Sequence, residues 1–132
     1  MSDGDLVRAS KRFFVKDYTR ALYTVRGAEA VSSPTLSATG GSHSSGNSSE
    51  DTMLRAVVAR QFLKEVEATL AVLDEEEAEI IRERYIKHKT AVEASFDECM
   101  STPSVYRVER RALIHWAYCW RAGVLLDDVK VG

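Results

Sequence analysis

Arginine and small hydroxyl residues are concentrated in one short stretch, ECMSTPSVYRVERR, at residues 98–111. Arginine can bind guanine with two hydrogen bonds and can pair with phosphate, and serine and threonine hydroxyls suit phosphate contacts. If the stretch is helical, Val105 and Val108 point inward. The side chains left to face outward or the backbone are then Ser101, Thr102, Ser104, Tyr106, Arg107, Arg110 and Arg111. This set predicts contacts with double-stranded DNA.

Groups that could support catalysis or metal binding do not form a recognisable set. His88 and His115 lack metal-ligand spacing to Cys99 and Cys119, which we expect to be reduced thiols. The acidic run DEEEAE at 74–79 suits a helix N-terminus with a solvated face better than a cation site. A phosphate-binding glycine loop and a Ser/His/Asp signature are both missing. We therefore expect no metal, no other cofactor and no enzymatic activity.

The basic residues are distributed unevenly along a chain whose net charge is only −2. Residues 6–26 hold six bases and one acid, and residues 65–79 hold seven acids and no base. Residues 82–121 return to eight bases against five acids. Because a local patch binds phosphate, and not the mean charge, the C-terminal third stays a candidate for nucleic-acid binding.

Composition and hydrophobic spacing predict an all-α protein that is soluble and cytoplasmic. The chain has 132 residues, 45% of them apolar, and no run near the roughly 18 apolar residues of a membrane span. We expect a basic N-terminal helix at 1–26, a flexible Ser/Gly-rich linker at 27–50 and a helical domain at 51–132. The domain begins with a long helix whose apolar stripe is Leu54, Val58, Phe62, Val66, Leu70 and Leu73.

Helix-start signals place two further helices. Asp74, with Glu77 three residues later, matches a capping box. Thr102 is expected to cap the helix that contains Pro103, and Gly123 to stand at its C-terminal end. In that helix the stripe of Val105, Val108, Leu113 and Trp116 is expected to be core, whereas Tyr118 and Trp120 suit either core or a dimer contact.

The region of about 90–122 fits a helix-turn-helix. Such a motif needs a small residue where its helices cross, a left-handed turn and apolar residues flanking that turn. Ser95 supplies the small residue, and Met100 the apolar residue after the turn. Two positions depart from the pattern, since Cys99 stands where glycine is usual and Glu98 where an apolar side chain normally packs. The pattern alone leaves an unspecialised helical bundle open.

The segments LDEEEAEIIRERYI and SFDECMSTPSVYRVERRALIHWA resemble sigma-factor region 4 and, more closely, the phage-encoded ArpU/RinA-like transcriptional regulators. The likeness covers most of the chain in layout and is concentrated at 73–117. It implies a helix-turn-helix activator of phage or prophage late genes that binds double-stranded DNA and acts with host RNA polymerase in the bacterial cytoplasm. It also implies that Lys87 and Lys89 hold phosphates beside the helix-turn-helix.

Two other classes of protein remain open. A small-terminase-like packaging protein also joins a helix-turn-helix to an oligomerising helix, but it would form a ring. A helical adaptor would bind proteins, and DNA only weakly. The stripe at 52–73 spans about three heptads, so a homodimer is open as well.

Overall fold

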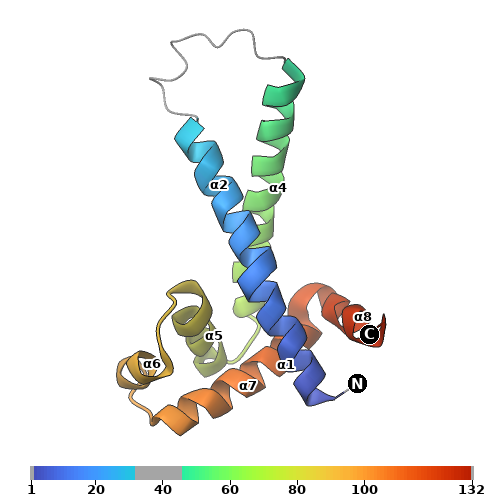
Figure 1. Ribbon diagram of the computed structural model, residues 1–132. Helices are drawn as coiled ribbons and strands as arrows, with labels where there is room; N and C mark the ends of the chain where they lie inside the picture. Colours follow the sequence, from blue (N-terminus) through green and yellow to red (C-terminus); the bar gives the residue numbers. More distant parts are fainter. Residues whose placement is uncertain (1, 32–45, 132) are drawn as a thin grey trace. The chain divides into compact units, whose positions relative to one another are not determined.

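The structure, a computed structural model, describes residues 2–31 and 46–131, and all regular structure in them is helical (Figure 1). The elements in chain order are α1 (Asp3–Arg12), η1 (Phe13–Tyr18), α2 (Thr19–Val31), α4 (Gly46–Leu70), α5 (Glu75–Ile81), η2 (Arg82–Ile86), α6 (Ala91–Asp97), α7 (Thr102–Cys119), η3 (Trp120–Ala122) and α8 (Val124–Val131). The all-α prediction is confirmed. In the described part of the chain, no helix is long and apolar enough to cross a membrane.

The chain divides into two compact units, and the division differs from the predicted domains. The first unit contains Met1–Val15 and Val66–Gly132, and the second contains Lys16–Glu65. The linker predicted at 27–50 is wrong at both ends, because α2 continues to Val31 and α4 begins at Gly46. Good helix formers at 28–30 explain the extension of α2, whereas the residues at 46–49 are poor helix formers and do not explain the early start of α4. The remainder of that linker, including His43, lies outside the described residues.

Four aromatic rings join α1 and η1 to α7 and η3 in the first unit. Phe13 lies 4.6 Å from Trp120 and Phe14 lies 4.7 Å from Trp116, measured between ring centroids. Ser10, in the same interface, donates its buried hydroxyl to the carbonyl of Leu113 at 2.7 Å. Trp116 and Trp120 are both buried, so Trp120 is core in this structure. The N-terminal helix is thus part of the folded unit that contains α7.

A smaller apolar cluster fixes α5 and α6 against the first half of α7. Its buried members are Ile80, Ala91, Ala94, Val105 and Val108, with Met100 packed at the edge. The prediction that Val105, Val108, Leu113 and Trp116 are core is confirmed. Because α5 and α6 have only seven residues each, this packing, and not helix propensity, must hold them in place.

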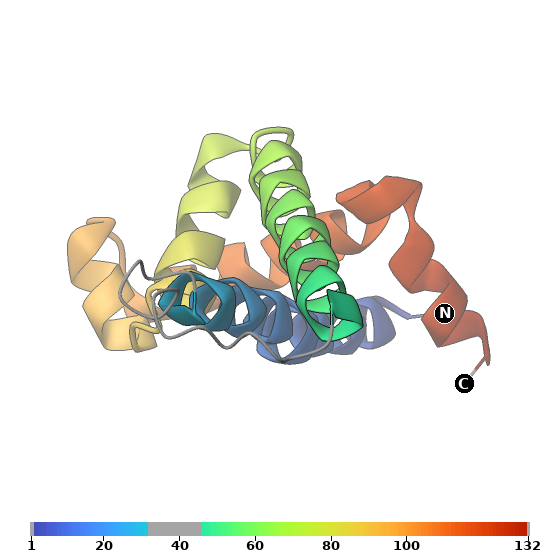
Figure 2. The ribbon, with the colours of Figure 1, turned by 90° about the horizontal axis from the view of Figure 1, so that it is seen from above.

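The second unit is a helical hairpin of α2 and the first part of α4 (Figure 2). The buried residues of its contact are the small side chains Ala21, Val25 and Ala59, and Phe62 and Leu63 pack against them partly buried. The apolar stripe predicted along α4 divides at this unit's boundary. Val66, Leu70 and Leu73 are buried in the first unit, whereas Leu54 and Val58 remain 62% and 60% exposed.

The caps of the helices correct two predictions. Ser101, and not Thr102, caps α7, since the Ser101 hydroxyl accepts from the backbone N–H of Ser104. Asp74 precedes α5 but makes no side-chain cap, and Glu77 is buried instead of completing a capping box. Gly123 follows η3 with a left-handed φ of 96°, and a helix that the sequence pattern did not predict, α8, starts after it.

Replacing Phe13 by Ala should destabilise the whole first unit. The ring is 2% exposed, and removing a buried aromatic side chain costs about 3–5 kcal/mol. Urea unfolding followed by tryptophan fluorescence would measure the change. The matched control is Val15→Ala, at a 61% exposed position, which should change the free energy of unfolding by less than about 0.5 kcal/mol. Equal effects of the two variants would contradict a core role for the N-terminal helix.

Candidate nucleic-acid interface

The turn between α6 and α7 has the hydrogen bonds of a Schellman motif. The N–H of Met100 donates to Ser95 at 3.0 Å and the N–H of Cys99 donates to Phe96 at 3.3 Å, in both cases to the carbonyl oxygen. Cys99 takes a left-handed φ of 54°, the conformation that usually selects glycine. Ser95 is buried, as a helix-crossing position requires. Residues 91–119 therefore form two helices joined by a left-handed turn, with a small buried residue in the first helix.

Serine hydroxyls at the start of α7 form a chain of hydrogen bonds that ends on an arginine. Ser101 donates to the Ser104 hydroxyl at 2.8 Å, and the Arg107 guanidinium donates to the same hydroxyl at 2.7 Å. Arg107 itself is exposed. Holding an arginine in one orientation lowers the entropy lost when it binds an anion or a base edge.

Arg110 lies beside a lysine that the sequence pattern did not assign to this surface. Lys11 of α1 and Arg110, Tyr106 and Glu109 of α7 line one small cavity of about 110 Å³. Both bases are exposed, so α1 extends the basic surface of α7. The sequence signalled a basic N-terminal helix, but nothing in it indicated that α1 packs on α7.

Arg111 is held by acids on α5. Its guanidinium donates to Glu77 at 2.7 Å and to Glu76 at 2.9 Å, and His115 Nδ1 lies 2.9 Å from Glu77. Glu77 is 1% exposed. Burial would raise its pKa, but the hydrogen bonds from His115 and Arg111 lower it below the ordinary glutamate value. Arg111 therefore anchors α7 to α5, although its side chain stays 47% exposed.

Arg84 and Tyr85 of η2 bind another buried carboxylate, that of Glu109 on α7. Arg84 donates to Glu109 at 2.8 Å and Tyr85 donates to it at 2.7 Å. Burial and this hydrogen bond raise the pKa of Tyr85, which keeps its hydroxyl protonated. The Arg84 guanidinium also lies 5.7 Å from the ring centre of Tyr106, which is 55% exposed. The π-helical turn thus orients one exposed aromatic residue of α7.

Lys87 and Lys89 differ in how far they are already paired. Lys89 Nζ forms ion pairs with Asp97 and with the buried Oε2 of Glu83, the latter at 2.7 Å but without hydrogen-bond geometry. Lys87 Nζ lies 3.8 Å from Oε1 of Glu83, and the Lys87 side chain is 53% exposed. Lys87 is the more accessible of the two for a phosphate contact.

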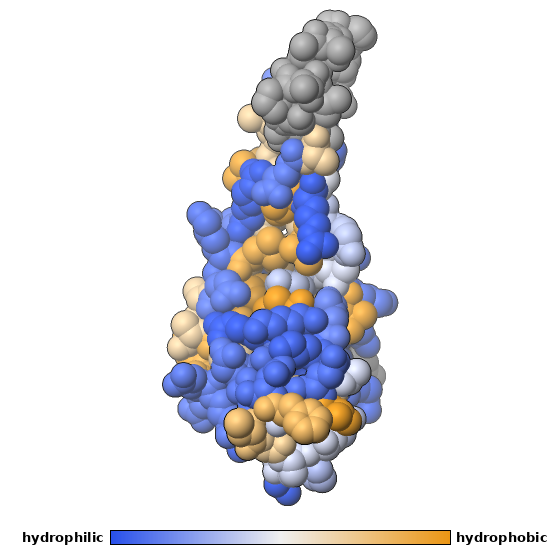
Figure 3. Space-filling view, turned by 90° about the vertical axis from the view of Figure 1, so that its left-hand side faces the viewer, coloured by the Kyte–Doolittle hydropathy of each residue, from blue (hydrophilic) through white to orange (hydrophobic). Residues whose placement is uncertain are grey.

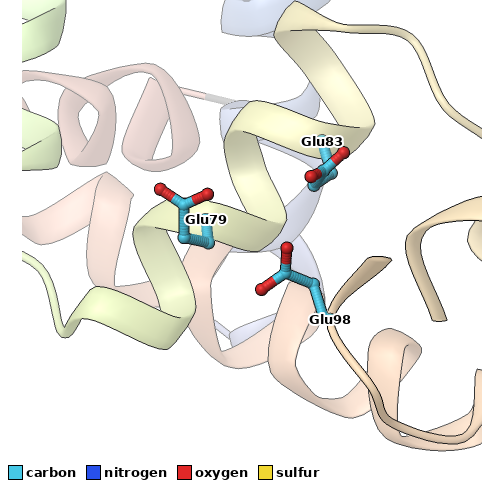
Figure 4. A group of neighbouring side chains, drawn as sticks. All are labelled: Glu79, Glu83 and Glu98. Atoms are coloured by element: carbon cyan, nitrogen blue, oxygen red, sulfur yellow. The ribbon is translucent and has the colours of Figure 1, made fainter. Parts of the chain in front are cut away.

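Three carboxyl groups, of Glu79, Glu83 and Glu98, gather beside the turn with oxygens within 4.8 Å of one another (Figure 4). Arg82 pairs with Glu79 at 2.9 Å, and Lys89 compensates Glu83. Burial first, and then the negative charges of Glu79 and Glu83, raise the pKa of Glu98. Two of the three negative charges are therefore offset by bases, and the raised pKa of Glu98 favours the neutral form of the third.

The nine residues predicted to contact DNA lie in one unit but fall into two groups. Arg107 and Arg110 are exposed and enter none of the ion pairs described above, and Lys87, Ser101 and Tyr106 are exposed as well. Thr102 and Ser104 are half-buried at the start of the same helix. Lys89 and Arg111, in contrast, hold the fold together through carboxylates. Spacing alone could not separate the groups, because their acidic partners lie 6 to 35 residues away.

Comparison with known proteins gave no match to a family model, to a curated protein or to a solved structure.

Replacing Cys99 by Gly should stabilise the turn by about 0.5–1 kcal/mol, because glycine adopts the left-handed conformation without the steric cost of a side chain. Cys99 is exposed, so little packing is lost. Urea unfolding would measure the gain. Cys99→Ala keeps the steric cost and is the control. An equal gain from alanine would show that the thiol, and not the backbone, is responsible.

Replacing Glu98 by Gln should remove a pH-dependent loss of stability. Because the folded-state pKa of Glu98 is raised, its cost is absent below the ordinary glutamate pKa and grows as pH rises through the raised value. We expect Tm at neutral pH to rise by about 2 °C and to match the parent at the acidic end. Thermal melts over a pH series test this. Glu75→Gln, at an exposed acid of the α5 first turn, should give no rise.

Proposed function

We propose that this protein binds double-stranded DNA sequence-specifically through α7, as a helix-turn-helix regulator of transcription. The proposal is supported above all by the combination of a Schellman turn, a buried small residue at the helix crossing and an exposed, ordered arginine at the start of the second helix. A helix that reads the major groove contacts base edges with its N-terminal residues. Here those residues are Ser101, Thr102, Ser104, Tyr106 and Arg107.

The role that we assign to each basic side chain depends on whether it already pairs with a carboxylate of the protein. Arg107 is placed to read a base edge or a flanking phosphate, and Tyr106 to make an apolar contact beside it. Arg110, Lys11 and Lys87 follow the phosphate backbone on either side. Arg111 and Arg84 keep the recognition helix in position by binding Glu77 and Glu109. Lys89 connects η2 to α6 through Glu83 and Asp97.

The biological setting in this proposal rests on the sequence resemblance alone. If the ArpU/RinA-like likeness at 73–117 holds, the protein activates phage or prophage late genes together with host RNA polymerase. The packaging-protein and adaptor alternatives share the helical architecture, so DNA selectivity is the property that separates them from a regulator.

Selection of bound duplexes from a random DNA pool tests the proposal directly. We expect one enriched motif with the parent protein. The double variant Arg107→Ala plus Arg110→Ala should bind that motif about 10- to 100-fold more weakly, since each lost base contact costs about 1–3 kcal/mol. The logarithmic salt dependence of binding should also become shallower by about one phosphate contact.

The matched control removes the same charge from the second unit. Arg26→Ala plus Arg60→Ala, both at exposed positions, should enrich the same motif as the parent. A parent that enriches no motif would contradict a sequence-specific regulator and leave the adaptor or packaging class. A motif that the α7 variant binds as tightly as the parent would contradict the placement of the DNA contact.

A further inference from the structure

The exposed side of the first part of α4 carries large aliphatic residues, whereas the fully buried residues of its contact with α2 are small. Met53, Leu54, Val57 and Val58 are 57–69% exposed. Ala56 and Ala59, on the opposite side of the same helix, are buried. A helix that faced only water would have the reverse distribution. Figure 3 shows one face of the molecule, on which apolar side chains of the hairpin lie exposed between hydrophilic ones. This pattern indicates a surface that is buried when the protein binds a partner.

A groove between α2 and α4 continues this surface. Its volume is about 460 Å³. Leu54, Val58 and Phe62 line it from α4, and Ala21 and Thr24 line it from α2. Asp17, Arg20 and Arg55 stand at its sides, so both signs of charge border an apolar floor. A surface that carries both signs can be complementary to itself, as a symmetric contact requires.

The charged residues along α4 favour one binding partner for this surface, a second α4 helix. Glu50 and Lys64 are both exposed, and each is one heptad away from Val57, so both lie on the same line of the helix as Val57. If two α4 helices pair antiparallel about Val57, Glu50 of each copy lies opposite Lys64 of the other. In a parallel pair each of these residues would face its own like charge.

We propose that the stripe formed by Met53, Leu54, Val57 and Val58 binds the same stripe of a second copy, antiparallel and centred on Val57. The contact is isologous, and its twofold axis generates two ion pairs between Glu50 and Lys64. The stripe from residue 50 to residue 65 is about 24 Å long. A single helix face of this length is smaller than a standard protein interface, so we expect micromolar affinity. This inference does not depend on DNA binding by α7.

Sedimentation velocity over a concentration series tests the dimer in the full chain. The parent should shift from the 14.7 kDa monomer to twice that mass as concentration rises. Leu54→Glu plus Val57→Glu should remain monomeric with unchanged helical circular dichroism, since both side chains are exposed in the monomer. Val72→Glu, at a 71% exposed position of the first unit, is the matched control and should dimerise like the parent.

Charge reversal tests the antiparallel arrangement separately. Glu50→Lys alone and Lys64→Glu alone should each weaken the dimer about fivefold, and the two together should restore it. A parent that stays monomeric at every concentration overturns the proposal, as does a dimer unaffected by Leu54→Glu plus Val57→Glu. A double reversal that stays weak overturns the antiparallel pairing. The Arg107→Ala plus Arg110→Ala variant should dimerise normally, which separates failure here from failure of DNA binding.

Discussion

The aromatic contact between η1 and α7 is the interaction on which the first unit depends. Phe13 and Phe14 fill the space beside Trp116 and Trp120, and Phe14 also stacks on Tyr85 at 5.3 Å. Tyr85 in turn binds Glu109 of α7. The π-helical turns at Phe13–Tyr18 and Arg82–Ile86 each bring residues into this contact. Short helices such as α5 and α6 would not be stable alone, so their placement follows from the burial of α7.

Buried carboxylates then determine which basic residues remain accessible. Glu77, Glu83 and Glu109 are each at most 5% exposed, and each is paired with a base near α7. A buried, unpaired carboxylate would be costly, which gives Arg84, Lys89 and Arg111 a structural role before any functional one. Arg107 and Arg110 lie on the same exposed side of α7 as Arg111 but enter none of these pairs. Pairing with a buried carboxylate therefore distinguishes bases that maintain the fold from bases available to a ligand.

Hydrophobic periodicity predicted most of the helices and the core of α7, because burial of Val105, Leu113 and Trp116 follows directly from helical spacing. It did not predict that α1 belongs to the unit of α7, since the contact of Phe13 with Trp116 joins residues far apart in sequence. The capping box at Asp74 was wrong for a related reason. Glu77 is bound by Arg111 and His115, and a local pattern contains no information about such distant partners.

The hydrogen bond from Ser10 to Leu113 spans 103 residues of chain, and it constrains the order in which the protein can acquire its structure. During synthesis, the N-terminal helix leaves the ribosome long before its partner α7 exists. Leu6, Phe13 and Phe14 are buried in the folded protein, so until α7 is synthesised they remain exposed to water or make transient contacts. Contacts of such high sequence separation form slowly, because the loop between them must close first. The hairpin of α2 and α4, encoded between these partners, can form earlier and shorten the effective distance.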